Sequence, residues 1–159
     1  MKLKVFTLYS DNLMNNEKGI DSEFEEFCLI NIKTTNQISM LFGCFYRSPT
    51  QHINYQTNNL DFLKRLSSTN QYKHRCFCGD FNFRDIKWPG CTTTKNENSA
   101  EYLFIETIRD CFLQQHVYEP TRRHGMNTPS TIDLIFTDNE VEIKNLEYCA
   151  PLGLSLIHI

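Results

Sequence analysis

The chain has 159 residues and a mass of 18.7 kDa, and 40% of its side chains are hydrophobic, which is enough for one domain with a core. Its 16 basic and 19 acidic residues give a net charge of −3, which excludes a protein held to nucleic acid by bulk positive charge. No apolar run reaches the roughly 18 residues of a membrane-spanning helix, and the first residues lack a signal-peptide core, so we expect a soluble, intracellular protein. The seven cysteines are scattered and odd in number, which favours free thiols over a disulfide framework or a zinc site.

Apolar patterns in the first half of the chain predict three strands, at Leu3–Tyr9, Phe27–Lys33 and Ile38–Tyr46. The third is apolar on both faces, so we expect it to be an internal strand. Apolar residues between Ile53 and Leu66 fit a helix moderately well. Arg75–Cys78 is a short apolar segment that we predict to be a buried strand ended by Gly79.

The clearest helix of the chain is predicted at Ala100–Phe112, where the apolar residues form one stripe and Asn98 with Glu101 can cap the first turn. Thr131–Thr137 alternates as a strand with one apolar face, and Val141–Tyr148 is predicted to be a further strand. Strands outnumber helices and the two do not alternate strictly. This pattern favours an α+β or mixed-sheet sandwich over a doubly wound parallel sheet.

Polar and aromatic residues alternate directly after the short buried strand. A period of two places Asp80 and Asn82 on one side and Phe81 and Phe83 on the other. A carboxylate that accepts a proton from water and an amide that donates to a phosphate oxygen suit the hydrolysis of a phosphate ester. The alternative is a polar turn in which both side chains bond to nearby backbone, and it is the more frequent case for such a segment taken alone.

Two other segments carry polar side chains beside apolar strands. Asp133 lies inside a predicted strand, where an unpaired carboxylate is costly, so it needs either a histidine that it orients or a structural ion or backbone partner. Tyr46 and Arg47 leave an internal strand and offer a phenol and a guanidinium to a phosphate. A tyrosine at the edge of the core followed by a solvated arginine is the alternative there.

These segments, taken in order, resemble a known family. Tyr46-Arg47-Ser48-Pro49, Gly79-Asp80-Phe81-Asn82-Phe83 and Pro129 to Phe136 are similar to motifs of the endonuclease domain of LINE-type (non-LTR) retrotransposons, in the endonuclease/exonuclease/phosphatase superfamily. The likeness covers about residues 20 to 153. It implies an α/β four-layer sandwich, with two packed mixed β-sheets flanked by helices. It also implies Mg²⁺- or Mn²⁺-dependent hydrolysis of a DNA phosphodiester, by which the family nicks its target site.

The resemblance also implies a role for each matching residue. Asp80 would position or deprotonate the attacking water, and Asn82 would help to hold the phosphate and the nucleophile. Tyr46 would donate a hydrogen bond to the phosphate, and Asp133 would orient a catalytic histidine.

Weaker contacts to the substrate are implied for four further residues, Arg47, Ser130, Arg122 and Arg123. The two neighbouring arginines and His124 form the best local basic patch, for which a solvated loop is the alternative. The expected partners are DNA and, in the parent polyprotein, a downstream reverse transcriptase. No membrane is expected to be involved, and the protein would be nuclear when it acts on DNA.

The chain departs from the family at both ends, so we expect residues 1–153 to be a partial domain, inactive by itself. The family's metal-binding glutamate precedes the first strand found here, which leaves the metal ligands unknown, with Asp80 as one candidate. The closing Ser-Asp-His motif is replaced by Ser155-Leu156-Ile157-His158, so the histidine's role is not carried onto His158. Residues 154–159 are expected to be non-native, because their possible codons match a transposase end sequence used for sequencing libraries.

Two alternatives to a DNA endonuclease are kept. One is a phosphodiesterase or phosphatase of the same fold that acts on phosphoinositides or sphingomyelin. The other is a degenerate, non-catalytic nucleic-acid-binding domain.

Overall fold

The computed structural model describes residues 26–33, 38–49, 53–122, 129–139, 141 and 143–149. The predicted strand Leu3–Tyr9, Arg123 with His124, and the tail 154–159 lie outside these residues. No helix in these ranges is long and apolar enough to cross a membrane.

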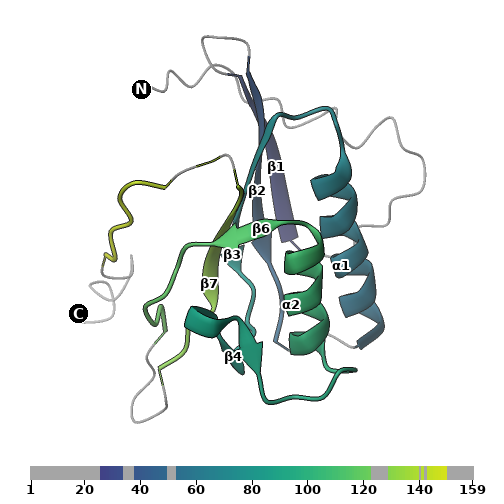
Figure 1. Cartoon of the computed structure of the whole chain (residues 1–159), viewed down its shortest axis with the longest axis vertical. Coiled ribbons are helices and arrows are strands. Elements are labelled where there is room, and N and C mark those ends of the chain that lie inside the picture. The colour runs from purple at the N-terminus through teal and green to yellow at the C-terminus, as the bar shows by residue number, and fades with distance from the viewer. Residues whose placement is uncertain are drawn as a thin grey trace, which may run out of the picture.

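Five strands form one mixed sheet in the spatial order β1-β2-β3-β7-β6 (Figure 1). They are β1 (Glu26–Lys33), β2 (Ser39–Tyr46), β3 (His74–Asp80), β6 (Leu113–Gln115) and β7 (Asp133–Asp138). β2 and β3 run parallel, and the other neighbouring pairs are antiparallel. β2 lies between two strands, which confirms the predicted internal position.

A second sheet consists of two short antiparallel strands, β4 (Ile86–Lys87) and β5 (Thr92–Thr93), joined by a 3-10 turn at Trp88–Gly90.

Two helices pack on one face of the large sheet, α1 (Ile53–Ser68) and α2 (Ala100–Asp110) (Figure 1). α1 makes the crossover that the parallel pair β2–β3 requires. α2 begins after Ser99, whose hydroxyl accepts a hydrogen bond of 3.2 Å from the N–H of Tyr102. The predicted cap at Asn98 was therefore wrong by one residue. With helices and mixed strands, the described residues form an α+β sandwich.

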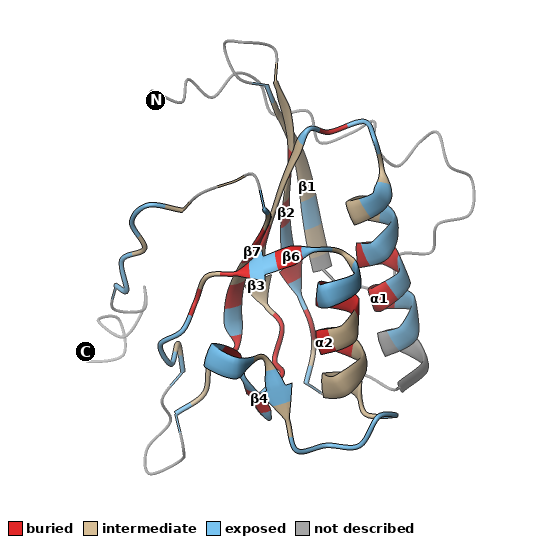
Figure 2. Cartoon of the chain, in the orientation of Figure 1, coloured by how far each residue is buried: buried red, intermediate tan, exposed pale blue. Residues whose placement is uncertain are grey.

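The core lies between the helices and the sheet and is mainly aromatic (Figure 2). Phe81 lies with its ring centroid 5.4 Å from those of Phe104 on α2 and Phe136 on β7, and Phe83 stacks on Phe104 at 4.3 Å. Phe45 on β2 contacts the same cluster. The prediction that Phe81 and Phe83 share the apolar side is confirmed, and the segment that carries Asp80 and Asn82 is thus anchored in the core.

Several element boundaries differ from the prediction by one or two residues. β3 does not stop at Gly79 but continues to Asp80, which still pairs with β2 and β7. β2 passes so close that a Cβ at position 79 would lie 1.8 Å from the carbonyl oxygen of Phe45. Gly79 also has a φ of 142°, so glycine lets the strand continue where it was expected to end it. β7 begins at Asp133, two residues later than predicted, and α2 ends at Asp110.

The strand predicted at Val141–Tyr148 is also wrong. Among the described residues of that range, none is in a strand. Tyr148 instead contacts a loop, where its hydroxyl accepts hydrogen bonds from the N–H groups of Tyr118 (3.2 Å) and Glu119 (3.4 Å).

Candidate active site

Strand register places three polar side chains in one row at an edge of the large sheet. Tyr46 is the partner of Asp80 across β2 and β3, and Asp80 is the partner of Asp133 across β3 and β7. Directly paired residues in neighbouring strands project to the same face of a sheet. The neighbouring Phe45 and Leu134 are buried on the helix side, so this row lies on the opposite face. The row Tyr46–Asp80–Asp133 is the centre of the candidate site.

The same register extends to a glutamate that the sequence did not favour as the metal ligand, because it lies beside a polar segment and not at the end of an apolar strand. Glu26, the first residue of β1, is the partner of Tyr46 across β1 and β2. The sequence offered one signal for it, because Glu26 directly precedes the alternating apolar segment from Phe27. Its backbone therefore begins β1 in line with the row.

Asp80 is a half-buried carboxylate with an acidic neighbour. Burial raises its pKa, and so does the negative charge of Asp133. Hydrogen bonds from Asn82, one of them from its N–H to Oδ1 at 3.1 Å, and the charge of Arg122 act in the opposite direction but are smaller. A carboxyl group with a raised pKa is a stronger base than an ordinary aspartate, which suits proton transfer from water.

Asn82 does not follow the period of two that the sequence predicted. Its backbone is left-handed, with a φ of 51°, and its buried side chain donates from Nδ2 to the carbonyl of Arg47 at 2.8 Å. Oδ1 is buried and has no hydrogen-bond partner within the described part of the chain. The turn that Asn82 forms with Asp80 is the backbone-bonded turn of the alternative interpretation, yet it leaves one amide oxygen available as an acceptor.

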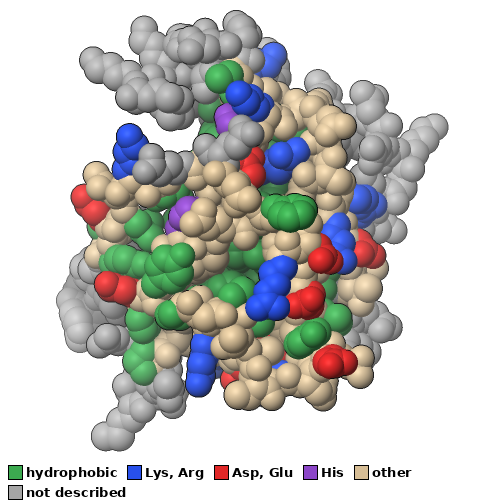
Figure 3. Space-filling model, viewed as in Figure 1, with side chains coloured by type: hydrophobic (Ala, Val, Ile, Leu, Met, Phe, Trp, Pro, Cys, Tyr) green, Lys and Arg blue, Asp and Glu red, His purple; other side chains and the backbone are tan. Residues whose placement is uncertain are grey.

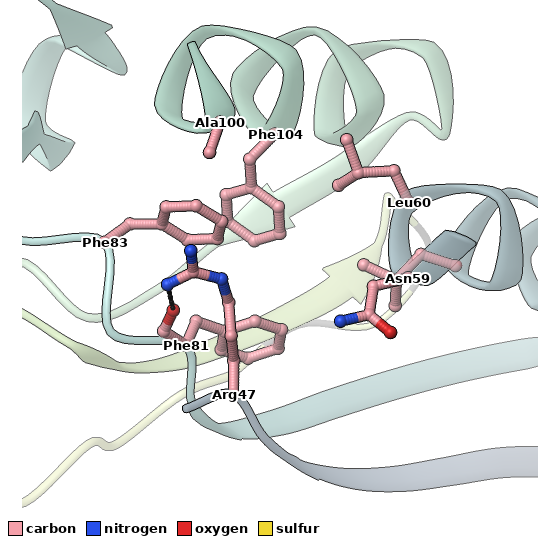
Figure 4. Close-up of a pocket in the computed structure, with 8 residues that line it drawn as sticks. Arg47, Asn59, Leu60, Phe81, Phe83, Ala100 and Phe104 are labelled. Atoms are coloured by element: carbon pink, nitrogen blue, oxygen red, sulfur yellow. Dashed lines mark hydrogen bonds between the residues drawn. The ribbon is translucent and has the colours of Figure 1, made fainter. Parts of the chain in front are cut away.

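Arg47 does not join the row. The residue is only 7% exposed, and its guanidinium carbon lies 4.2 Å from the ring centroid of Phe83 on the helix side (Figure 4). It lines a cavity of about 10 Å³ together with residues of α1 and α2. The predicted contact with phosphate finds no support in this position, and the alternative of a solvated arginine is wrong.

Asp133 is exposed at the start of β7, not enclosed in a strand as predicted. Its carboxylate is bonded by no histidine in the described ranges, and the histidine partner stays a prediction. The backbone N–H groups of Ile132 and Asp133 both donate to Thr121 Oγ1 at 3.1 Å. Thr121 thus fixes the start of β7, a role that nothing in the local pattern revealed.

Arg122 and Ser130 face each other across a short β-bridge beside the row. Each N–H donates to the carbonyl of the other at 3.0 Å. Arg122 is exposed and near enough to Asp80 to lower the pKa of that carboxyl. Of the two arginines predicted to contact the substrate, Arg122 therefore lies beside the acidic row. Arg123 is outside the described residues.

A groove of about 460 Å³ borders the row on the side of β7. It is lined by Asp133 and Thr121, by Gly79 from β3 and by Tyr148 from the segment 143–149. Of the row, Asp133 is the residue that lines this groove.

The residues in the row fit a hard divalent cation. The described residues contain no group of three or more histidine, cysteine, aspartate or glutamate side chains that could hold a metal ion by themselves. However, Mg²⁺ is commonly held by one or two carboxylates together with water and substrate phosphates. Asp80 and Asp133 supply two adjacent carboxylates whose mutual repulsion raises the pKa of Asp80, and a cation between them would relieve that repulsion.

Comparisons with known proteins identify the family of the chain and its fold. A family model described as endonuclease-reverse transcriptase matches residues 40–155. The endonuclease domain of TRAS1, a telomere-specific non-LTR retrotransposon, has 16% sequence identity and a TM-score of 0.51, over 72% of this chain and 49% of that domain. The chain thus spans about half the length of that structure, and the likeness shows the fold. No curated protein matches the chain.

Two structures from Bacteroides thetaiotaomicron are less similar. One is a mannosyl-6-phosphatase, with 12% identity and a TM-score of 0.44, over 71% of this chain and 42% of that one. The other is an endonuclease/exonuclease/phosphatase family protein, with 13% identity and a TM-score of 0.42, over 71% and 41%.

Proposed function

The chain belongs to the endonuclease-reverse transcriptase family, and we propose that it carries the phosphodiester-cleaving site of a DNA endonuclease that uses Mg²⁺ or Mn²⁺. The observation that supports this most is the row Tyr46–Asp80–Asp133, which the register of three strands places on one open face. A phenol and two carboxylates beside a groove are what cleavage of a phosphate ester requires in one place.

In this proposal, Asp80 accepts the proton of the water that attacks the phosphorus. Burial and the charge of Asp133 raise its pKa, so its carboxylate is a stronger base than that of an ordinary aspartate. Asn82, whose amide oxygen Oδ1 has no hydrogen-bond partner among the described residues, helps to hold the phosphate and the attacking water. Tyr46, which is 38% exposed, donates its hydroxyl proton in a hydrogen bond to a phosphate oxygen.

The divalent cation would be held by Asp80 and would supply Lewis-acid stabilisation of the charge that develops on the phosphate. Asp133 would orient a histidine, as the resemblance implies. Because the resemblance places a metal-binding glutamate and that histidine outside the motifs matched here, we propose that this chain alone nicks DNA poorly.

The proposed substrate is DNA and the proposed reaction is nicking of a target site. The exposed Arg122 and the backbone of Ser130 lie beside the row, where they can contact phosphates on either side of the one that is cleaved. Arg123 follows Arg122 directly in the sequence and is proposed to extend the same contact. A reverse transcriptase in the parent polyprotein and a nuclear site of action belong to this proposal.

The test is a nicking assay on supercoiled plasmid with Mg²⁺, using the chain extended by the coding sequence that flanks it in its gene. Asp80→Ala is expected to reduce nicking by at least about 100-fold, because the base is removed. Asp85→Ala is the matched control, since Asp85 is an exposed aspartate five residues further on that pairs with Lys95 at 3.0 Å. Nicking by the Asp80 variant at the rate of the parent would remove Asp80 from the mechanism. Binding without any cleavage would favour a non-catalytic nucleic-acid-binding domain.

A further inference from the structure

Arg47 makes contacts with four consecutive residues of the candidate site. Its backbone N–H donates to the carbonyl of Asp80 at 2.9 Å, and its own carbonyl accepts from Asn82 Nδ2 at 2.8 Å. Its guanidinium donates to the carbonyl of Phe81 at 3.5 Å and covers the ring of Phe83 (Figure 4). The segment after β3 is thus held from end to end by one residue.

The segment needs such support because of its backbone. Asn82 has a left-handed φ of 51°, a conformation that residues other than glycine adopt only where the surroundings hold them. The Arg47 side chain binds the residue on each side of Asn82, namely Phe81 and Phe83. These contacts hold Asn82 in this conformation from both sides.

An arginine suits this position better than any other cation. The guanidinium is planar, so it can cover the Phe83 ring and donate in its own plane to the Phe81 carbonyl. Burial lowers the pKa of Arg47, and the charges of Glu101 and Asp80 partly offset that effect. The group stays protonated, since arginine is not deprotonated in proteins.

We propose that Arg47 is a positioning residue of this site, which fixes Asp80 and Asn82 from the helix side of the sheet for a reaction on the opposite face. The inference rests on the proposed function, and it assigns Arg47 to the alignment of the catalytic segment and not to the substrate. Loss of the guanidinium would leave every group of the row present but let Asn82 and its amide oxygen move.

The test compares Arg47→Met and Arg47→Lys with Arg75→Met. Arg75 is a matched control because it is half-buried and, like the buried Arg47, bonds backbone, donating to the carbonyls of Leu66 (3.2 Å) and Thr69 from the other end of β3. Two quantities are measured. Hydrogen exchange at the backbone amides of Phe81 and Asn82 is followed by NMR in the 159-residue chain. The kcat and KM of nicking are measured in the chain extended by its flanking coding sequence.

Arg47→Met is expected to speed exchange at Asn82 about tenfold and to lower kcat about 10- to 100-fold, with KM changed less than about twofold. Arg47→Lys, which keeps the charge but not the planar group, should lie between Arg47→Met and the parent. Arg75→Met should lower the Tm and leave both readouts at the parent level. Unchanged exchange at Asn82, or an unchanged kcat in an active protein, would overturn the inference. If the extended parent does not nick, the proposed function fails, and the exchange comparison alone decides whether Arg47 holds the segment.

Discussion

At the scale of single residues, the raised pKa of Asp80 makes the stability of the fold depend on pH. Burial and the charge of Asp133 raise the pKa of Asp80 above its ordinary value of 3.8. The folded state therefore binds this proton more tightly than the unfolded chain does. The contribution of Asp80 to stability is most favourable below the ordinary pKa and is lost as the pH rises through the raised one.

Asp80→Asn should accordingly stabilise the fold at pH 7. The gain is expected to stay under about 1 kcal/mol, because Asp80 is only half-buried and solvent screens its charge. The amide oxygen of the variant can still accept from the N–H of Asn82. Urea denaturation at neutral pH and near pH 3 measures the free energy of unfolding of the parent and of Asp80→Asn. The difference between the two proteins should vanish at the lower pH. If Asp80→Asn were destabilised equally at the two pH values, the carboxylate of Asp80 would not be repelled by its surroundings in the folded protein.

Gly79 determines how close β2 and β3 come beside Asp80. Gly79→Ala should destabilise the fold by about 3 kcal/mol or more, because the new Cβ would meet the Phe45 carbonyl oxygen at 1.8 Å in a backbone with a φ of 142°. Thermal unfolding measures this. Gly90→Ala is the control, since its Cβ would meet no atom closer than 3.6 Å, and its Tm should change little.

At the scale of elements, the longer strands and the core helix could be predicted from the local pattern, whereas a common site for Tyr46, Asp80 and Asp133 was implied only by the resemblance to a family. Alternation and apolar runs identify β1, β2 and β7 within a few residues, and the apolar stripe identifies α2. Which strands are neighbours depends on contacts between residues far apart in the chain. The pairing of Asp80 with Asp133 is such a contact, so the pattern of either segment alone left its alternatives open.

Arg47 and the segment from Val141 show why the remaining predictions were wrong. A charged residue directly after a strand is usually solvated, and the Phe83 ring and the Phe81 carbonyl, supplied by the segment that follows β3, make burial of Arg47 favourable. Residues 141–148 alternate like a strand, but of those the structure describes none pairs with the large sheet. Local pattern cannot show whether a partner edge is present.

One side-chain hydroxyl, that of Thr121, accepts two backbone hydrogen bonds at the start of β7. Thr121→Val keeps the shape of the side chain but leaves the N–H groups of Ile132 and Asp133 without their acceptor, so we expect a loss of about 1–3 kcal/mol. Thr121→Ser keeps the hydroxyl and should therefore retain most of the stability that Thr121→Val loses. Thermal unfolding compares the three proteins. Thr131→Val is the control, because the Thr131 hydroxyl makes one hydrogen bond, to the Glu119 carbonyl. Thr131→Val should therefore lower the stability less than Thr121→Val does. A Thr121→Val variant as stable as the parent would show that the start of β7 is held by other contacts.

At the scale of the whole molecule, charge restricts how the protein can bind DNA. The net charge is −3, and on the face in Figure 3 the described acidic and basic side chains are interspersed and form no large patch of one sign. Attraction to a phosphate backbone must then come from a few local cations. Among the described residues of the candidate site, Arg122 is the exposed cation that lies beside the row Tyr46–Asp80–Asp133.

The salt dependence of DNA binding tests this directly. Each phosphate contact contributes about −0.9 to the slope of log K against log salt concentration, so a site with few cations should give a slope between about −1 and −3. Arg122→Gln should make that slope shallower by about one unit and weaken binding about equally for all sequences. Fluorescence anisotropy of a labelled duplex, between about 50 and 200 mM salt, provides the measurement. Arg109→Gln is the matched control, because Arg109 is equally exposed but lies on α2, where it pairs with Glu106 at 2.7 Å. A slope of −6 or steeper would require about seven phosphate contacts, so the protein would hold DNA through a surface other than the edge of the row. A slope left unchanged by Arg122→Gln would lead to the same conclusion.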